Sequence, residues 1–116
     1  MQITMARGDM LTKSFTVKVG QTAFTDPFDN IYLTIKKHAD EKEYLVQKRL
    51  SDGGIESLGN GKYQFSIEPG DTDQMGFGEY DFDIELVING IMKKTFAGKF
   101  ILTKEVTHLC NEVTGT

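Results

Sequence analysis

The sequence has little of what a secreted, membrane-bound or disulfide-stapled protein needs. Cys110 is its only cysteine among 116 residues, so no disulfide can form within the chain. That excludes the disulfide-stapled immunoglobulin domains of the extracellular milieu. No segment approaches the roughly 18 apolar residues of a membrane-spanning helix, and residues 1–7 contain no apolar run typical of a secretion signal. We therefore expect a protein that is made and folded in the cytoplasm and does not enter a membrane.

A basic excess is also missing. The net charge is −4, from 17 acidic and 13 basic residues, which argues against general binding of nucleic acid or of anionic membrane surfaces. Twelve glycines against two prolines indicate many tight turns. A chain of this length forms one domain and can bury about two thirds of its unfolded surface, so it needs no metal to fold.

Alternating apolar and polar residues dominate what is present, in short runs separated by turn signals. In residues 80–86 the apolar side chains of Tyr80 and Phe82 alternate with Asp81 and Asp83. Because successive side chains of a strand point to opposite faces, this run predicts a strand with one wet face. The same pattern predicts strands whose inward residues are, in chain order, Phe15, Val17 and Val19; Ile31, Leu33 and Ile35; Tyr63, Phe65 and Ile67; and Phe96, Phe100 and Leu102.

Two Asn-Gly pairs predict hairpins. Asn89-Gly90 lies between two apolar dipeptides, and Asn60-Gly61 precedes another run. Both residues of a type I′ turn need positive φ, which Asn and Gly tolerate best. Asp52-Gly53-Gly54 closes a further run, and Gly98 indicates a bulge or a close contact in the last strand.

Two segments leave the pattern. Residues 37–50 contain good helix formers, and residues 39–49 could form three turns, but a charged loop followed by a strand is the favoured reading. Residues 68–75 are expected to cross between sheets, with a helical turn capped by Asp71 or Thr72.

About seven short strands predict an all-β fold, an immunoglobulin-like antiparallel β-sandwich, with a small open β-barrel as the alternative. We expect the domain to span residues 1–107. Residues 108–116 lose the pattern and are expected to form a flexible C-terminal tail.

No catalytic, cofactor-binding or metal-binding residue is predicted. The sequence from Asp71 to Gly76 begins like a calcium loop, but Met75 and Phe82 occupy two ligand positions. Asp81, Asp83 and Glu85 form a row of carboxylates that a flat strand face would leave solvated.

Three further motifs have simpler readings. Arg7-Gly8-Asp9 matches the integrin tripeptide but reads better as a glycine corner leading into the first strand. His108 and Cys110 lack the additional ligands of a zinc site and the positioned base of a nucleophile. A basic cluster is diluted by interleaved acids, and we attribute it to solubility; its members are Lys36, Lys37, Lys42, Lys48 and Arg49, with Tyr32 and Tyr44 nearby.

The order of these features resembles a known family. In chain order they are Arg7-Gly8-Asp9, strands at 11–19, 31–37, 45–48 and 61–67, then Asp71-Thr72, and strands at 78–84 and 98–102. This order is similar to the immunoglobulin-like N-terminal domain of tailed-phage upper baseplate proteins, a family also found in prophages. The likeness covers residues 5–107.

The resemblance implies a structural role in a phage or prophage tail, with other baseplate proteins as partners, a homo-oligomer as a possibility, and no cofactor. The protein would be made in the bacterial cytoplasm and assembled into the virion tail. Gly78-Glu79-Tyr80 looks like the tyrosine corner of immunoglobulin-type folds, and Phe82 stands where antibody domains place a cysteine. With Asn89 and Gly90 these are the structural residues we single out.

Two other functions are open. A carbohydrate-binding or adhesion module is the alternative, although a sugar ligand is disfavoured because the chain has no tryptophan and most aromatics fall on inward positions. An enzyme ranks lowest, since no two reactive groups have a spacing that implies a shared cleft.

Overall fold

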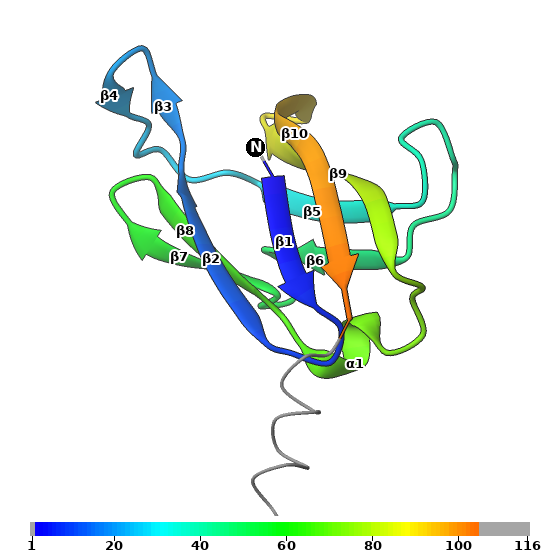
Figure 1. The fold of residues 1–116 in the computed structure, drawn as a ribbon. Helices are drawn as coiled ribbons and strands as arrows, with labels where there is room; N and C mark the ends of the chain where they lie inside the picture. Colours follow the sequence, from blue (N-terminus) through cyan, green and yellow to red (C-terminus); the bar gives the residue numbers. More distant parts are fainter. Residues whose placement is uncertain (1, 105–116) are drawn as a thin grey trace, which may run out of the picture.

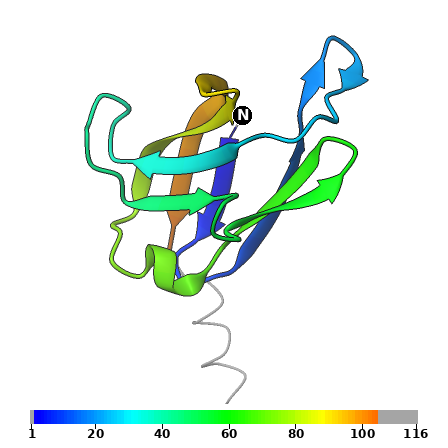
Figure 2. The same cartoon turned by 180° about the vertical axis from the view of Figure 1, so that it is seen from behind.

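The computed structural model describes residues 2–104, apart from the side chains of residues 94 and 95. Two β-sheets face each other, and a small ribbon projects from one end (Figures 1 and 2). In spatial order the five-stranded sheet contains β1 (Gln2–Ala6), β10 (Ile91–Thr103), β9 (Gly78–Ile88), β5 (Asn30–Lys36) and β6 (Val46–Arg49). The three-stranded sheet contains β2 (Leu11–Thr16), β8 (Lys62–Ile67) and β7 (Ile55–Gly59). The ribbon is β3 (Lys18–Val19) with β4 (Thr22–Ala23), and α1 (Pro69–Thr72) joins β8 to β9.

This architecture confirms the predicted all-β sandwich. The strands fall into separate sheets and not into one sheet closed on itself, so the barrel alternative does not describe the chain. The order β2-β8-β7 opposite β10-β9-β5 is that of an immunoglobulin-type fold. All strand pairs are antiparallel except β1 with β10, which is parallel.

The core lies between the sheets and follows the alternation of the sequence. On β9 the inward Tyr80, Phe82, Ile84 and Leu86 are all buried. The neighbouring strands add further buried residues: Ile31, Leu33 and Ile35 from β5, Tyr63, Phe65 and Ile67 from β8, and Phe100 and Leu102 from β10. Removing this apolar area from water is the main force that holds the two layers together.

Strand β1 was not predicted. Its Ile3 and Met5 are buried while Gln2 and Thr4 are exposed, which is the period of a strand at the sheet edge. The alternation is too short to indicate a strand without knowledge of its partner, since β1 pairs with the far end of the chain in β10.

The prediction that Val19 lies in the core was wrong. Its side chain is 67% exposed, although Phe15 and Val17 on the same run are buried. The amide of Val17 donates to the carbonyl of Gly61, and its own carbonyl accepts from Phe24. The first bond continues the β2–β8 register by one residue, and the second belongs to the β3–β4 register, so the chain changes partner at Val17 and Val19 lies in the separate ribbon.

Both Asn-Gly turns have the predicted geometry. Asn89 and Gly90 have φ of 52° and 76°, and Asn60 and Gly61 have φ of 55° and 78°. Of the two alternatives predicted for Gly98, the bulge does not lie there: Gly98 pairs with Phe82, and the register of β10 against β9 shifts between Lys94 and Phe96.

The two ambiguous segments resolve differently. Residues 37–45 form a loop before β6, as the favoured reading predicted. The helical turn also forms as α1, but its N-cap residue is Glu68, and Asp71 takes part in the cap only as the other half of a capping box. Asp71 is the third helical residue, and its carboxylate accepts the amide of Glu68 at 2.7 Å. The predicted tail, residues 108–116, lies outside the described residues.

Candidate binding surfaces

The predicted tyrosine corner lies at the start of β9. The hydroxyl of Tyr80 donates to the carbonyl oxygen of Gly76 at 2.6 Å, and its ring packs against Phe100. Gly78 adopts φ of 130°, which strongly favours glycine. Phe82 is buried in the core behind the corner. These residues fix the loop before β9 to the interior.

The Asn89-Gly90 turn is tied to the body of the molecule. The amide of Gly90 donates to the carboxylate of Asp29 at 3.2 Å, across 61 residues of sequence. The β9–β10 hairpin is thereby held against the segment that precedes β5.

The row of carboxylates lies over a shallow depression and not on a flat face. We call this depression the sheet hollow: it occupies about 340 Å³ on the outer face of β5, β9 and β10. Its lining residues are Thr34, Lys36, Ala39, Asp81, Phe82, Asp83, Ala97, Gly98 and Lys99. Ala97, which pairs with Asp83 on this face, is small and leaves space that a larger side chain would fill.

Asp81 makes two short contacts at the sheet hollow. Its carboxylate accepts from the ammonium of Lys99 at 2.7 Å and from the amide of Ala39 at 2.8 Å. The hydrogen bond from Lys99, aided by that of Ala39, lowers the pKa of Asp81 below its usual value, and the same contact raises the pKa of Lys99. A carboxyl group that acts as a general acid at neutral pH needs a raised pKa. The pKa of Asp81 is shifted in the opposite direction.

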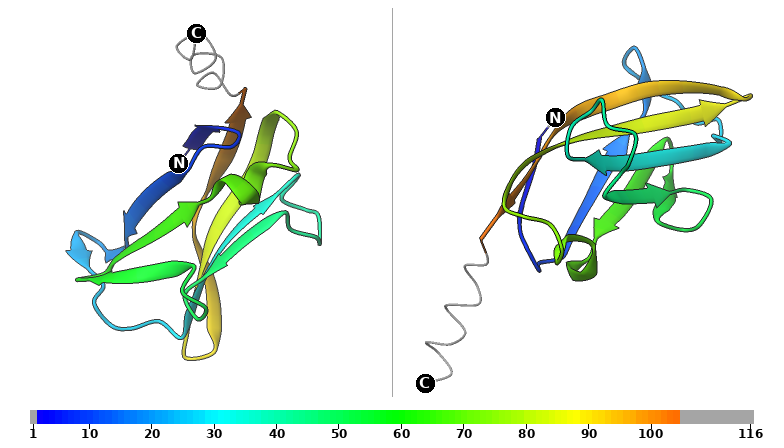
Figure 3. Two further views of the ribbon diagram at one scale, coloured as in Figure 1. Left: turned by 90° about the horizontal axis from the view of Figure 1, so that it is seen from below. Right: turned by 90° about the vertical axis from the view of Figure 1, so that its right-hand side faces the viewer.

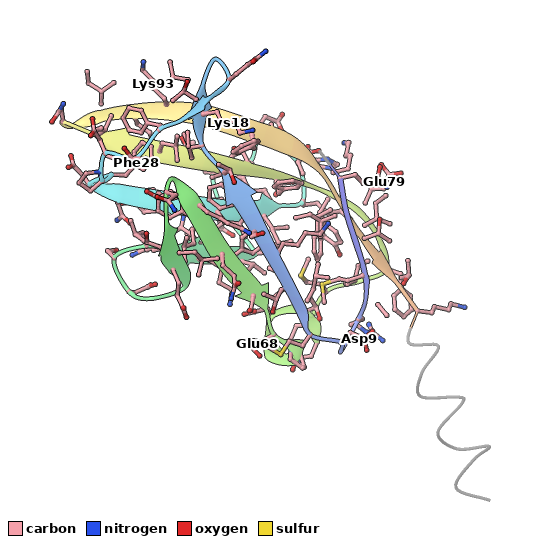
Figure 4. The ribbon with its side chains drawn as sticks, turned by 90° about the vertical axis from the view of Figure 1, so that its left-hand side faces the viewer. Asp9, Lys18, Phe28, Glu68, Glu79 and Lys93 are labelled. Atoms are coloured by element: carbon pink, nitrogen blue, oxygen red, sulfur yellow. The ribbon has the colours of Figure 1, made fainter. Side chains whose placement is uncertain are left out.

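A second depression lies at the end of the molecule that carries the β3–β4 ribbon. We call it the hairpin groove: it has a volume of about 230 Å³ and is lined by Val17, Lys18, Val19, Phe24, Phe28, Leu86, Ile88 and Lys93. Figure 4 shows Lys18, Phe28 and Lys93 at this end, and Asp9 and Glu68 at the opposite one. The lining is apolar apart from the two lysines.

The rim of the hairpin groove exposes further apolar surface. Ile91 pairs with the lining residue Ile88 and so shares its face of the sheet, and it is 58% exposed, while Val19 of the lining is 67% exposed. Met92 is 56% exposed but pairs with Val87 on the opposite face. Figure 3 shows the β9–β10 hairpin that carries Ile91 and Met92 as a long curved ribbon. Neither lysine of the groove has an acidic partner within the part of the chain that the structure describes.

The sequence reasoning missed the hairpin groove. It placed Val19 in the core and gave no role to Ile91, Met92, Lys18 or Lys93. The available signal was the apolar dipeptide after Asn89-Gly90, because an apolar residue next to a hairpin turn has little chance of burial.

Arg7-Gly8-Asp9 forms a structural corner between β1 and β2. The guanidinium of Arg7 donates to the carbonyl of Met75 at 3.2 Å and lies 4.3 Å from the ring centre of Phe77. The amide of Gly8, at φ of 88°, donates to the hydroxyl of Thr72. The corner therefore ties the β1–β2 turn to α1, although it precedes the second strand and not the first.

The calcium-like segment and the basic cluster do not form sites. The carboxylate of Asp71 pairs with Lys48 at 2.6 Å, which joins α1 to β6. Arg49 donates to Gln47, and Lys37 lies over the ring of Tyr80. Over residues 2–104 no three His, Cys, Asp or Glu side chains gather in a way that could hold a metal ion. His108 and Cys110 lie outside the described residues.

Comparison with known proteins supports the fold. No family model and no curated protein matches the chain. Seven chains of solved structures match, and one is the endo-beta-1,4-mannanase from Thermotoga petrophila. The likeness has a TM-score of 0.58 at 17% identity and covers 89% of this chain but 18% of the mannanase chain. This chain thus spans less than a fifth of the length of that enzyme, and identity this low shows a shared fold alone.

No helix in the described part of the chain is long and apolar enough to cross a membrane.

Proposed function

We propose that the chain is a non-catalytic structural module of a phage or prophage tail, which joins baseplate proteins through protein–protein contacts. The observation that carries the proposal is the apolar surface at the hairpin end, where the hairpin groove includes the exposed Val19 and the exposed Ile91 shares one sheet face with the lining residues Leu86 and Ile88. Contiguous exposed apolar surface of this kind is typical of protein interaction sites.

The resemblance to the N-terminal domain of upper baseplate proteins supplies the finer part of the proposal. It supports assembly in the virion tail after synthesis in the bacterial cytoplasm. The immunoglobulin-type order of the two sheets and the bond from Tyr80 to Gly76 are consistent with that family.

A non-catalytic role agrees with the state of the best-placed carboxylate. Asp81 is neutralised by Lys99 and has a lowered pKa. Its carboxylate is therefore suited to fixing the 37–45 loop to the sheet and not to moving protons.

The direct test is co-purification with neighbouring tail proteins. The genes that flank this one are expressed together with it, and complexes are separated by sedimentation. We expect the chain to co-sediment with at least one baseplate or fibre protein. A strict monomer that binds none of them would argue against the proposal.

A carbohydrate-binding module is the second candidate, favoured by the likeness to part of a mannanase and by the polar sheet hollow. Sugar sites commonly combine hydrogen-bonding side chains with an aromatic platform. The hollow offers Thr34, Asp81 and Lys99 for the first, but its only aromatic residue, Phe82, is buried. A glycan array that includes mannans tests this candidate, and an absence of signal would exclude it.

A further inference from the structure

The inner face of the five-stranded sheet continues past the three-stranded sheet. In the β9–β10 register Ile91 pairs with Ile88 and Lys93 with Leu86, and paired residues share one face of a sheet. Leu86 is buried in the core, so Ile91 lies on the core-facing side, and yet it is largely exposed. The groove formed there is faced by the β3–β4 ribbon and by Phe24 and Phe28.

We propose that the hairpin groove binds an extended segment of another tail protein, in which apolar side chains alternate with carboxylates. The proposal rests on the proposed function for the class of partner, and names the chemistry by which the partner is recognised.

The apolar half of the proposal follows from the floor of the groove. The rings of Phe24 and Phe28 lie 5.2 Å apart, and Phe28 lies 6.0 Å from Tyr63 of the core. An apolar side chain seated on this floor would therefore extend the existing core, and both the side chain and the floor would be removed from contact with water. Aromatic pockets that continue a packed interior are typical anchoring points of interfaces.

The acidic half follows from the charges at the rim. Lys18 and Lys93 are the two charged residues that line the groove, and both side chains are exposed. They stand on opposite walls, one on the ribbon and one on β10. Carboxylates on either side of an inserted apolar residue would each meet a lysine, whereas a basic segment would be repelled.

An extended conformation follows from the walls. The ribbon consists of two residue pairs, Lys18 with Ala23 and Val19 with Thr22, and pairs with no other strand of the described chain. Its outer edges can accept a further strand by backbone hydrogen bonding. An extended segment also points alternate side chains to opposite sides, so its apolar side chains can face the floor of the groove while the carboxylates between them stay at the rim, where Lys18 and Lys93 stand.

Binding of matched peptides tests the recognition chemistry on the full chain. The probe is a short fluorescent peptide in which valine and glutamate alternate, and its control replaces each glutamate with lysine. Fluorescence anisotropy at low ionic strength should show binding of the acidic probe and none of the basic one. Raising the salt concentration should weaken the acidic probe, because exposed charge pairs are screened.

Variants locate the binding at the groove. Replacing both lysines, Lys18→Glu with Lys93→Glu, should weaken the acidic probe by about tenfold or more, since two attractions become repulsions. Val19→Asp should weaken it as well, because it places a charge on the apolar wall. The matched controls are Lys42→Glu in the 37–45 loop and Leu58→Asp on β7, both at exposed residues, and they should bind like the wild type.

Several results would overturn the inference. They are equal binding of the two probes, binding of neither, or acidic-probe binding that the groove variants leave unchanged. A dimer of the chain alone that Val19→Asp abolishes would show that a second copy occupies the groove. Groove-dependent binding to phosphatidylglycerol vesicles would show a lipid surface instead.

The two proposals fail separately. If tail proteins co-sediment with the wild type and equally with the groove variants, the proposed function stands and the groove inference falls. If the acidic probe binds the groove but no tail protein co-sediments, the recognition chemistry stands and the phage assignment falls.

Discussion

The hydroxyl of Tyr80 lies 2.6 Å from the carbonyl oxygen of Gly76, four residues earlier in the chain. The ring of Tyr80 is buried beside Phe100, so one side chain spans from the core to the loop that follows α1. That loop also supplies the carbonyl of Met75 that Arg7 binds. The end of the molecule opposite the hairpin groove is therefore closed by side-chain hydrogen bonds to backbone carbonyls.

We expect Tyr80→Phe to lower the free energy of unfolding by about 1 kcal/mol, the usual net value of one hydrogen bond. The ring keeps its packing, so the loss reports the bond to Gly76 alone. Urea denaturation followed by circular dichroism measures it. Tyr44→Phe, at an exposed tyrosine, is the control and should leave the midpoint unchanged. Equal midpoints for the wild type and Tyr80→Phe would show that the corner does not stabilise the fold.

Local patterns in the sequence predicted most of the fold. The alternation at Tyr80 and Phe82 and the turn chemistry at Asn89-Gly90 act over a few residues, so both can be recognised without knowledge of the partner strand. What could not be predicted depends on distant contacts. Strand β1 forms because it pairs with β10, where Ile3 lies opposite Phe100, nearly a hundred residues away in sequence.

The candidate site was harder to predict, for the same reason. Val19 continues an alternating run, and only the change of partner at Val17, from Gly61 to Phe24, leads it away from the core. Whether an apolar residue lines a groove or a core is decided by what covers it, and that information is tertiary. The row of carboxylates misled in a similar way, because the space of the sheet hollow depends on the small Ala97 on another strand.

The two Asn-Gly hairpins should respond differently to the same substitution. A methyl group added at Gly61 would lie 2.6 Å from the carbonyl oxygen of Phe24, whereas one at Gly90 meets nothing within 4 Å. Both residues have φ near 77°, so Gly90→Ala should cost about 1–2 kcal/mol from backbone strain alone. Gly61→Ala should cost clearly more, because the ribbon must also shift.

Thermal unfolding of the two glycine variants side by side measures this difference. Gly90→Ala serves as the matched control for strain without a clash. Equal melting temperatures would mean that the contact between Gly61 and Phe24 yields easily, so that the root of the β3–β4 ribbon is not fixed by packing.

Phe82 should behave as a core residue and not as a remnant of a disulfide site. Its side chain is almost fully buried between the sheets. Phe82→Ala should therefore destabilise the domain by about 3–5 kcal/mol, through lost burial and the cavity that remains. Leu58→Ala, at an exposed residue, should change the free energy of unfolding by less than about 0.5 kcal/mol. Chemical denaturation of both variants tests this, and a Phe82→Ala protein as stable as Leu58→Ala would contradict the described packing.

The ion pair between Asp81 and Lys99 predicts how stability depends on pH. The pKa of Asp81 is lowered in the folded state, mainly by its hydrogen bond from Lys99. Its contribution is thus present above the unfolded-state pKa of an aspartate and is lost as the pH falls through the folded-state pKa. The pKa of Lys99 is raised by the same partner, so the contribution is also lost as the pH rises through the folded-state pKa of that lysine.

Asp81→Asn separates the charge of this group from its shape, since the amide oxygen can still accept from Ala39. The variant should be less stable than the wild type at neutral pH, and the two should become equally stable in strong acid, where Asp81 is protonated. Denaturation midpoints across the acid range measure the convergence, with Asp40→Asn in the exposed 37–45 loop as the control for a general charge effect. In parallel, NMR titration of the Asp81 carboxyl in Lys99→Met should show its pKa moving up toward the usual value. If the pKa of Asp81 is the same in Lys99→Met as in the wild type, the hydrogen bond from Ala39 and not that from Lys99 lowers it.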